Sequence, residues 1–289
     1  MTAIIGAGFD VTFHGVRGST PCDGEEVARY GGNTSCVSLA IPDQDPLLFD
    51  LGTGLRYYGL DCPSDEPFLG SCLLTHLHWD HIQGLPFFTP LLRDGAHLDV
   101  YAPTQPDGRP LGDVFGACLC PPTFPISIDA FPGTIHFHGV GDDSFRIGEV
   151  EVMSRVIPHV GTTCGYRVTW GGASVAYLSD HQQPGVDVFE MSEGARDLCE
   201  GADLLIHDAQ YTAEEFRAKS TWGHCTVDYA VWLAAECGVK TLALYHHDPT
   251  HGDDVVDQFV DKANAHCGGS GLEIIGAREG LTVRVGAPS

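Results

Sequence analysis

Apolar and polar positions alternate along much of this 289-residue chain, in short runs that end at glycine, proline or a charged residue. Such runs predict strands, at 11–16, 36–41, 47–54, 71–74, 98–102, 150–157, 163–170, 173–180, 204–211, 241–247 and 281–285. Short turns join the first three, so we expect antiparallel pairing there, and Gly171-Gly172 predicts a hairpin between two later strands. A period of about 3.6 predicts helices at 226–237 and 253–266. The mixture indicates an α/β protein.

One Pro-rich stretch interrupts this pattern between residues 103 and 132. Its seven prolines are Pro103, Pro106, Pro110, Pro121, Pro122, Pro125 and Pro132. So dense a run excludes a central strand or a helix interior, so we expect an irregular excursion. Long excursions of this kind often act as lids or binding loops, and this one has apolar residues that would pack on the body or on a second subunit. No domain boundary or repeat is visible, so we expect one domain over residues 1–289.

Four potential metal ligands follow the apolar run at 71–74. They are His76, His78, Asp80 and His81, in the pattern His-x-His-x-Asp-His. While the backbone stays extended, His76 and His78 point to one side, whereas Asp80 and His81 turn with the backbone and can face a second ion. Imidazole suits zinc and related transition ions, and a carboxylate adds charge. The next run, 82–88, is predicted to be a short helix that ends among prolines.

Further histidines and acids stand where other apolar runs end. Asp50 follows 47–49, His159 follows 150–157, and Asp180 closes 173–180. The pair His246-His247 closes 241–247, where strand alternation would turn only one ring inward. The alternative for the first cluster is a histidine-rich surface loop, which four ligands at this spacing make improbable. Histidines without such a placement are expected to be structural or solvated, namely His14, His97, His136, His138, His181, His207 and His266.

Composition constrains the cellular compartment and the classes of partner. The net charge of −24 repels a polyanion at long range, so nucleic acid is not an expected partner, although the same acidity would suit solubility or a saline cytoplasm. Eleven cysteines without a Cys-x-x-Cys pair indicate reduced thiols in a cytoplasm. No apolar run approaches the roughly 20 residues that cross a bilayer, and residues 1–10 lack the features of a signal peptide. We therefore expect a cytoplasmic protein without a membrane partner, and base rates favour a homodimer if it associates.

The pattern His-x-His-x-Asp-His resembles the signature of the metallo-β-lactamase superfamily. His159, Asp180 and His246 resemble its third, fourth and fifth motifs, in the order that this superfamily uses. The resemblance runs from about residue 11 to residue 251 and implies a four-layer αββα sandwich with a two-metal site at one edge. An aliphatic-x-His pattern followed closely by Pro favours His246 over His247 as the fifth motif.

This resemblance implies ligands for two divalent ions, Zn²⁺ first, with Mn²⁺ or Fe²⁺ as alternatives. The residue matching Asp50 braces the His-rich loop from behind, because ligand histidines usually need an outer hydrogen-bond acceptor. Two ions about 4 Å apart can share a hydroxide at neutral pH. One ion would be held by His76, His78 and His159, the other by Asp80, His81 and His246, with Asp180 bridging.

A finer resemblance involves residues 207–211 and 222–226. The phosphodiesterase branch, which includes ribonuclease Z and the cyclic phosphodiesterases, carries a Gly-His-Ser-Thr element before a helix and a His-Glu-Ala-Thr-like element upstream. Here Cys225 replaces the Ser and Asp208 replaces the Glu. His224 would stand before a helix N-terminus, where a phosphate is favoured, and could protonate the leaving group with Asp208 orienting its ring. The alternative is a helix-capping loop around Thr226 with an incidental histidine.

The sequence therefore predicts a dinuclear metal-dependent phosphodiesterase in which a metal-bridged hydroxide attacks a small or cyclic phosphodiester. Asp80, His224 and Asp208 are its expected catalytic residues, and Arg17 and Asn33 are weak candidates for substrate contacts that would otherwise shape turns. The β-lactamases proper lack the His224 element, so antibiotic hydrolysis is not expected. Alternatives are tRNA 3′-end processing of the ribonuclease Z type, thioester or lactone hydrolysis, and a metal-binding module without turnover.

Overall fold

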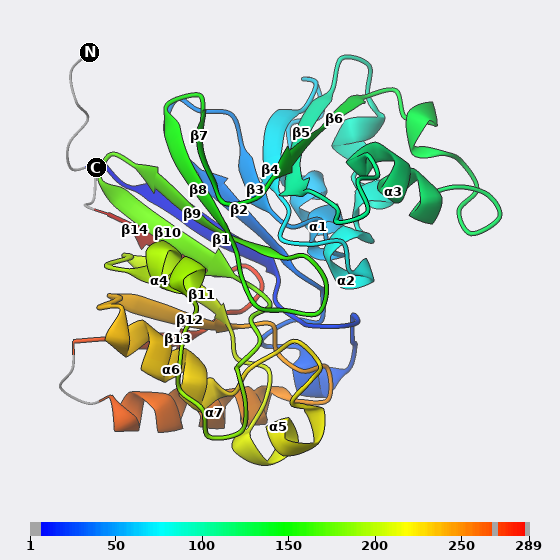
Figure 1. Ribbon diagram of the computed structural model, residues 1–289. Helices are drawn as coiled ribbons and strands as arrows, with labels where there is room; N and C mark the ends of the chain where they lie inside the picture. The colour runs from blue at the N-terminus through cyan, green and yellow to red at the C-terminus, as the bar shows by residue number, and fades with distance from the viewer. Residues whose placement is uncertain (1–6, 268–270, 287–289) are drawn as a thin grey trace.

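Two seven-stranded sheets pack face to face, with helices on their outer faces (Figure 1). The computed structural model describes residues 7–267 and 271–286. The first sheet runs in the order β14 (Thr282–Val285), β1 (Phe9–Gly15), β2 (Cys36–Ala40), β3 (Leu47–Phe49), β4 (Leu69–Leu73), β5 (His97–Pro103) and β6 (Thr134–Val140). The second runs β13 (Glu273–Gly276), β12 (Thr241–Tyr245), β11 (Leu204–Asp208), β10 (Ala173–Leu178), β9 (Cys164–Trp170), β8 (Val150–Val156) and β7 (Asp143–Ile147).

The helices divide between the two sheets. Those over the first sheet are α1 (Gly54–Asp61), α2 (Trp79–Ile82) and α3 (Leu111–Cys118), whose apolar side chains join one core cluster with β3, β4 and β5. Those over the second sheet include α4 (Glu193–Cys199), α6 (Val227–Glu236) and α7 (Asp253–His266), which share another cluster with β10, β11 and β12. The remaining helix, α5 (Ala213–Lys219), follows β11. The layers are those of the expected αββα sandwich.

Strand β10 shows why the sheets are sandwiched. All six of its residues are buried, because alternate side chains face different layers. Val175 and Tyr177 enter the core between the sheets, whereas Ala176 and Leu178 pack against the outer helices. Tyr177 stacks on Phe49 of the opposite sheet, with ring centroids 4.5 Å apart and planes at 11°. Alternate side chains of β10 thus contribute to two hydrophobic cores, one between the sheets and one beneath the outer helices.

Strand direction decides where the site forms. The antiparallel pairing of β1, β2 and β3 and the hairpin between β9 and β10 are confirmed. From β3 to β6, and from β10 to β13, neighbours are parallel. Because the carboxyl ends of parallel strands meet at one edge, the loops after β4, β10, β11 and β12 gather there, on the side of the sandwich away from the termini (Figure 1).

Two local predictions were wrong. Instead of a helix at 82–88, the single-turn helix α2 spans Trp79–Ile82 and contains Asp80 and His81, and a 3-10 turn follows at Leu85–Phe87. The Pro-rich excursion is not wholly irregular, because α3 occupies Leu111–Cys118. Its prolines precede and follow this helix instead of interrupting it, which is compatible with proline sterics.

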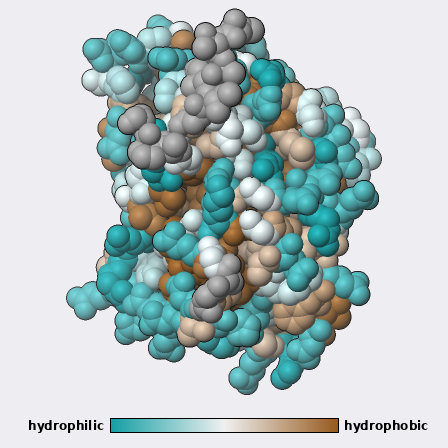
Figure 2. All heavy atoms as spheres, turned by 90° about the vertical axis from the view of Figure 1, so that its left-hand side faces the viewer, coloured by the Kyte–Doolittle hydropathy of each residue, from teal (hydrophilic) through white to brown (hydrophobic). Residues whose placement is uncertain are grey.

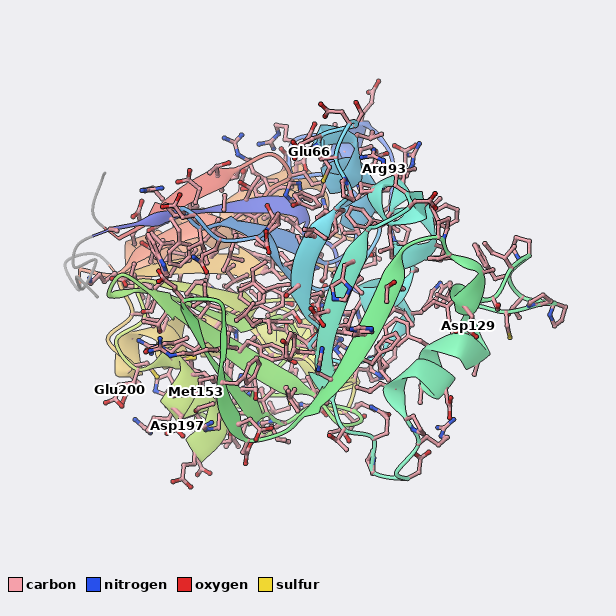
Figure 3. All side chains as sticks on the ribbon, turned by 90° about the horizontal axis from the view of Figure 1, so that it is seen from above. Glu66, Arg93, Asp129, Met153, Asp197 and Glu200 are labelled. Carbon is pink, nitrogen blue, oxygen red and sulfur yellow. The ribbon has the colours of Figure 1, made fainter. Side chains whose placement is uncertain are left out.

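The Pro-rich excursion and helix α4 lie at opposite ends of the molecule (Figure 3). The excursion, with Asp129, projects away from the part of the second sheet and α4 that carries Met153, Asp197 and Glu200 (Figure 3). On the face seen in Figure 2, hydrophilic residues form most of the surface and apolar residues gather near its centre.

None of the helices in the described residues is long and apolar enough to span a bilayer. The first six residues of the segment considered for a signal peptide lie outside the described residues.

Candidate metal centre

The carboxylate of Asp180 lies at the centre of the loops that gather beyond the strand ends. Its Oδ1 is 3.5 Å from His246 Nε2, 3.8 Å from His159 Nε2 and 3.9 Å from His76 Nε2. Its Oδ2 is 3.2 Å from His81 Nε2. Burial alone would raise the pKa of Asp180, but the imidazoles around it hold that pKa well below its usual value. The carboxylate is thus ionised and faces histidines from both expected groups.

The first group comprises His76, His78 and His159, whose ligand atoms all lie within 4.8 Å of one another. His159 donates from Nδ1 to the carbonyl of Gly223 at 2.6 Å, so its Nε2, 3.3 Å from His78 Nδ1, is the nitrogen that can bind an ion. Burial lowers the pKa of His159 to about 4 and that of His76 well below its usual value. Neutral imidazole is the form that binds a transition ion.

The second group comprises Asp80, His81 and His246, with ligand atoms again within 4.8 Å of one another. Asp80 Oδ2 lies 3.3 Å from His81 Nε2 and 3.3 Å from His246 Nε2. Burial would lower the pKa of His81, yet Asp180, Asp80 and Asp50 raise it well above its usual value. The surrounding carboxylates therefore favour a positive charge at this point, which a divalent ion would supply.

Buried polar atoms without hydrogen-bond partners test whether the residues present fit two metal ions. Among the described residues, His76 Nε2, His81 Nε2 and Asp180 Oδ2 are buried and have no hydrogen bond. Leaving such groups unpaired costs roughly 1–3 kcal/mol each, so their convergence needs an explanation. All three belong to side chains of the candidate ligand groups, and a donor set of imidazoles with few carboxylates suits zinc and related ions. The residues present therefore fit two divalent ions.

Asp50 ties this centre to the sandwich. Its Oδ1 accepts hydrogen bonds from the backbone N–H and hydroxyl of Thr75, at 2.8 and 2.9 Å. Its Oδ2 accepts from His81 Nδ1 and from the Tyr177 hydroxyl, both at 2.8 Å. The side chain is fully buried and its φ is 57°, in the left-handed region. This geometry agrees with the bracing position expected for Asp50.

Some contacts at this centre were not predicted from the sequence. Gln210 Oε1 accepts from His246 Nδ1 at 3.0 Å, so it orients that ring toward Asp80. The N–H of Ser19 donates to Asp80 Oδ2 at 2.8 Å. Glycine is required at Gly223, where φ is 98° and a Cβ would stand 2.4 Å from the His159 ring. The only sequence signal for Gln210 was its place two residues after the end of β11.

The two adjacent histidines are separated by backbone geometry and not by strand alternation. Strand β12 ends at Tyr245, and His246 then has φ 56°. Its ring faces Asp80 and Asp180, whereas His247 Nε2 lies 2.9 Å from the Ala277 carbonyl, at the far side of the loop. Both rings are buried. The left-handed backbone at His246 thus turns its ring toward Asp80 and Asp180, while the His247 ring contacts Ala277.

His224 lies beside both groups. Its Nδ1 is 2.9 Å from Asp208 Oδ2, and its ring stacks on His246 with centroids 5.0 Å apart. Burial lowers the pKa of His224, but Asp208 outweighs this and raises it. Helix α6 begins just beyond, where Thr226 caps the backbone N–H of Tyr229. The expected helix-capping loop and the expected His–Asp pair are therefore both present.

Arg17 and Asn33 are held by other residues. Arg17 is fully buried and donates to the backbone carbonyls of Gly31 and His251 at 2.8 and 2.7 Å. Asn33 donates from Nδ2 to Glu279 at 3.0 Å. Both side chains are thus used to shape loops, which was the alternative to substrate contact.

Metal content tests the centre directly. After zinc-supplemented growth and dialysis against metal-free buffer, elemental analysis should find close to two transition ions per chain. Asp180→Ala should lose at least one, because its carboxylate touches both groups, while Asp129→Ala on the excursion should lose none. A wild-type ratio near zero would contradict a dinuclear centre.

The histidine pair gives a second test. His246→Ala should lower metal content and remove hydrolytic turnover, whereas His247→Ala should keep both ions and lower the unfolding free energy by about 1–3 kcal/mol, because it leaves a buried carbonyl unpaired. Elemental analysis and urea unfolding measure the two effects. If His247→Ala loses metal while His246→Ala keeps it, the assignment within the pair is reversed.

Known proteins resemble this chain in both sequence and fold. A model of the beta-lactamase superfamily domain matches residues 60–247. Ribonuclease Z of Synechococcus sp. (strain CC9311) is 29% identical, with 88% of this chain and 93% of the relative covered. Ribonuclease Z of Lactococcus lactis subsp. lactis (strain IL1403) is 25% identical, with 80% and 88% covered.

Solved structures share the whole architecture. The metallo-beta-lactamase fold protein YhfI from Bacillus subtilis superposes with a TM-score of 0.72 at 21% identity, covering 96% of this chain and 99% of its own. The short form of human tRNase Z has a TM-score of 0.67 at 22% identity, with 95% and 98% covered. The chain therefore belongs to the metallo-beta-lactamase superfamily, on its ribonuclease Z-like branch, and its fold and clustered His and Asp side chains are those of a metal-dependent hydrolase.

Proposed function

We propose that this protein is a phosphodiesterase that hydrolyses a small or cyclic phosphodiester at the two-metal centre. The observation that carries the proposal is the position of His224, whose Nδ1 lies 2.9 Å from Asp208 Oδ2 and 3.8 Å from Asp180 Oδ1 of the ligand groups. Cleavage of a P–O bond expels an alkoxide, and a general acid beside the ions would supply its proton.

The chain's own residues divide the work. When bound, two divalent ions supply charge neutralisation at the phosphoryl oxygens and activation of water. The ligands would be His76, His78 and His159 for one ion, Asp80, His81 and His246 for the other, and Asp180 for both. The N–H of Ser19 donates to one oxygen of Asp80 and so fixes its position.

Proton delivery falls to His224. Asp208 accepts from its Nδ1–H and so leaves Nε2 as the atom that can face the substrate. As water oxygen bonds to phosphorus and the P–O bond to the leaving group breaks, the imidazolium gives its proton to the departing alkoxide. Asp208 is itself held, since its Oδ1 accepts from the N–H of Gln210 at 3.0 Å. The pair is thus positioned before substrate arrives.

Exposed aromatic rings suggest a nucleoside-like substrate. Trp79, next to His78, is 54% exposed, and Trp222, next to Gly223, is 60% exposed. Lys219 Nζ lies 5.6 Å from the Trp222 ring centroid and is paired with Asp248 at 3.1 Å. Base–aromatic stacking is worth about 1–3 kcal/mol per base, so exposed indoles next to ligand residues favour a substrate that carries a nucleobase.

The second candidate function is tRNA 3′-end processing, because the curated relatives are ribonuclease Z enzymes. Charge opposes it. The net charge is −24, and the excursion at 103–132 contains one arginine against three aspartates. That arginine, Arg109, is paired with Asp107. A surface of this sign repels a long polyanion and tolerates a small diester with few charges.

A substrate panel separates these functions. Metal-loaded protein should hydrolyse bis(p-nitrophenyl) phosphate and cyclic nucleotides with kcat/KM at least about 100-fold above that for a thioester or a lactone. A precursor tRNA with a 3′ trailer should be cut poorly at physiological salt. Preferential cleavage of the tRNA would select the second candidate, preferential cleavage of the carbonyl substrates would select a thioester or lactone hydrolase, and no turnover on any substrate would indicate a binding module.

His224 provides the mechanistic test. His224→Ala should keep both ions and lower kcat for phosphodiesters by about 10²–10⁴-fold, the usual scale for a general acid. Asp208→Asn should cause a smaller loss, and the double variant should be non-additive if the two residues act as a unit. The exposed His266→Ala is the matched control and should behave as wild type. Full activity in His224→Ala would refute the role, while loss of metal would make His224 a ligand.

A further inference from the structure

A second cluster of metal-binding side chains lies on the edge of the first sheet, in β5 and β6. In β5, His97 and Asp99 are two residues apart and therefore share a face. The parallel register sets His136 of β6 directly opposite Asp99, with His138 two residues further along on the same face. As isolated residues, these histidines were expected to be structural or solvated. The pairing of the two strands makes them one group.

The ligand atoms of this group already converge. One potential ligand atom from each of His97, Asp99 and His136 lies within 4.8 Å of the other two. His97 Nε2 is 3.0 Å from Asp99 Oδ2, and His136 Nδ1 is 4.0 Å from Asp99 Oδ1. Ligands in a tetrahedron around an ion at about 2.0–2.1 Å stand roughly 3.3 Å apart, which lies between these separations. Small rotations of partly exposed rings would complete such a site.

His138 holds the carboxylate of Asp99 at Oδ1, the oxygen that is not in contact with His97. Its Nε2 lies 2.6 Å from Asp99 Oδ1. The His138 ring stacks on Tyr101, with centroids 4.6 Å apart, and Tyr101 stacks in turn on Phe145 at 4.9 Å. This aromatic stack fixes the donor, so Asp99 is oriented in the way that carboxylate ligands of metal sites are.

We propose that His97, Asp99 and His136 form a third metal site, for Zn²⁺ or a similar divalent transition ion, with His138 as the positioning residue of its carboxylate. Two imidazoles and one carboxylate are ligands that such ions accept, and three protein ligands leave positions for water or an exogenous ligand. The acidity of the chain, with a net charge of −24, raises the local concentration of cations.

This site is separate from the hydrolytic centre. Asp99 pairs with Ser71 of β4, and five residues lead from Ser71 to His76. At about 3.3 Å per residue the two sites are roughly 15 Å apart. No residue is shared, so the proposal does not depend on the proposed function.

The first test compares the zinc content of wild type with that of variants at the proposed site. Full-length protein is dialysed against buffer with micromolar Zn²⁺, and bound zinc is measured by elemental analysis. Wild type and the exposed control His266→Ala should hold one ion more than His97→Ala and than His136→Ala. His138→Ala should keep the ion with affinity lower by about 10–100-fold, the usual effect of losing such an orienting partner. Because only a difference is measured, the number of ions in the hydrolytic centre does not enter.

A second readout identifies the ligands. Cu²⁺ added to zinc-loaded protein should displace Zn²⁺ from this partly exposed site, because Cu²⁺ binds such ligands more tightly. Wild type should then give an electron paramagnetic resonance spectrum with nitrogen coupling from two imidazoles, and the double variant His97→Ala/His136→Ala should not. Phosphodiesterase activity should be equal in both proteins. Equal zinc content in wild type and both single variants, or a copper spectrum unchanged by the double variant, would overturn the proposal and leave a hydrogen-bonded surface network.

Discussion

The buried carboxylate of Asp50 is the contact on which the metal centre depends. It lies at the end of β3 and accepts hydrogen bonds from Thr75 and His81 of the His-rich segment and from Tyr177 of the opposite sheet. One side chain therefore joins both sheets to the ligand loop. A buried charge is tolerated only when it is fully hydrogen-bonded, and here the bonds that satisfy it are the same bonds that orient a ligand.

At the metal centre, buried carboxylates and imidazoles stabilise one another's charges. Asp80 and Asp180 remain ionised because imidazoles surround them, and the carboxylates in turn raise the pKa of His81. Orphaned atoms such as His76 Nε2 show that the protein groups alone do not complete this balance. Divalent ions would complete it, so metal binding and local stability are coupled at this edge of the sandwich.

The two proposals draw on the same architecture in different ways. At the hydrolytic centre, loops beyond parallel strands bring together residues that are distant in sequence, and the His224–Asp208 pair adds proton chemistry to them. At the sheet edge, the strands themselves present ligands, because alternation and register align His97, Asp99 and His136. Because the chain is strongly acidic, with a net charge of −24, it would attract metal cations to both sites and repel large anions.

The sequence by itself determined the fold family and the ligand types, because the His-x-His-x-Asp-His pattern, the strand-end position of Asp180 and the position of His224 before a helix are local features. Only the tertiary structure decided how these residues meet. His246 enters the site through a left-handed turn that no periodicity reveals, and Gln210 orients it across a loop. Helix α3 within the Pro-rich excursion and the grouping of the β5 and β6 histidines were likewise invisible. Such features depend on strand order and register, which are set by packing between segments distant in the chain.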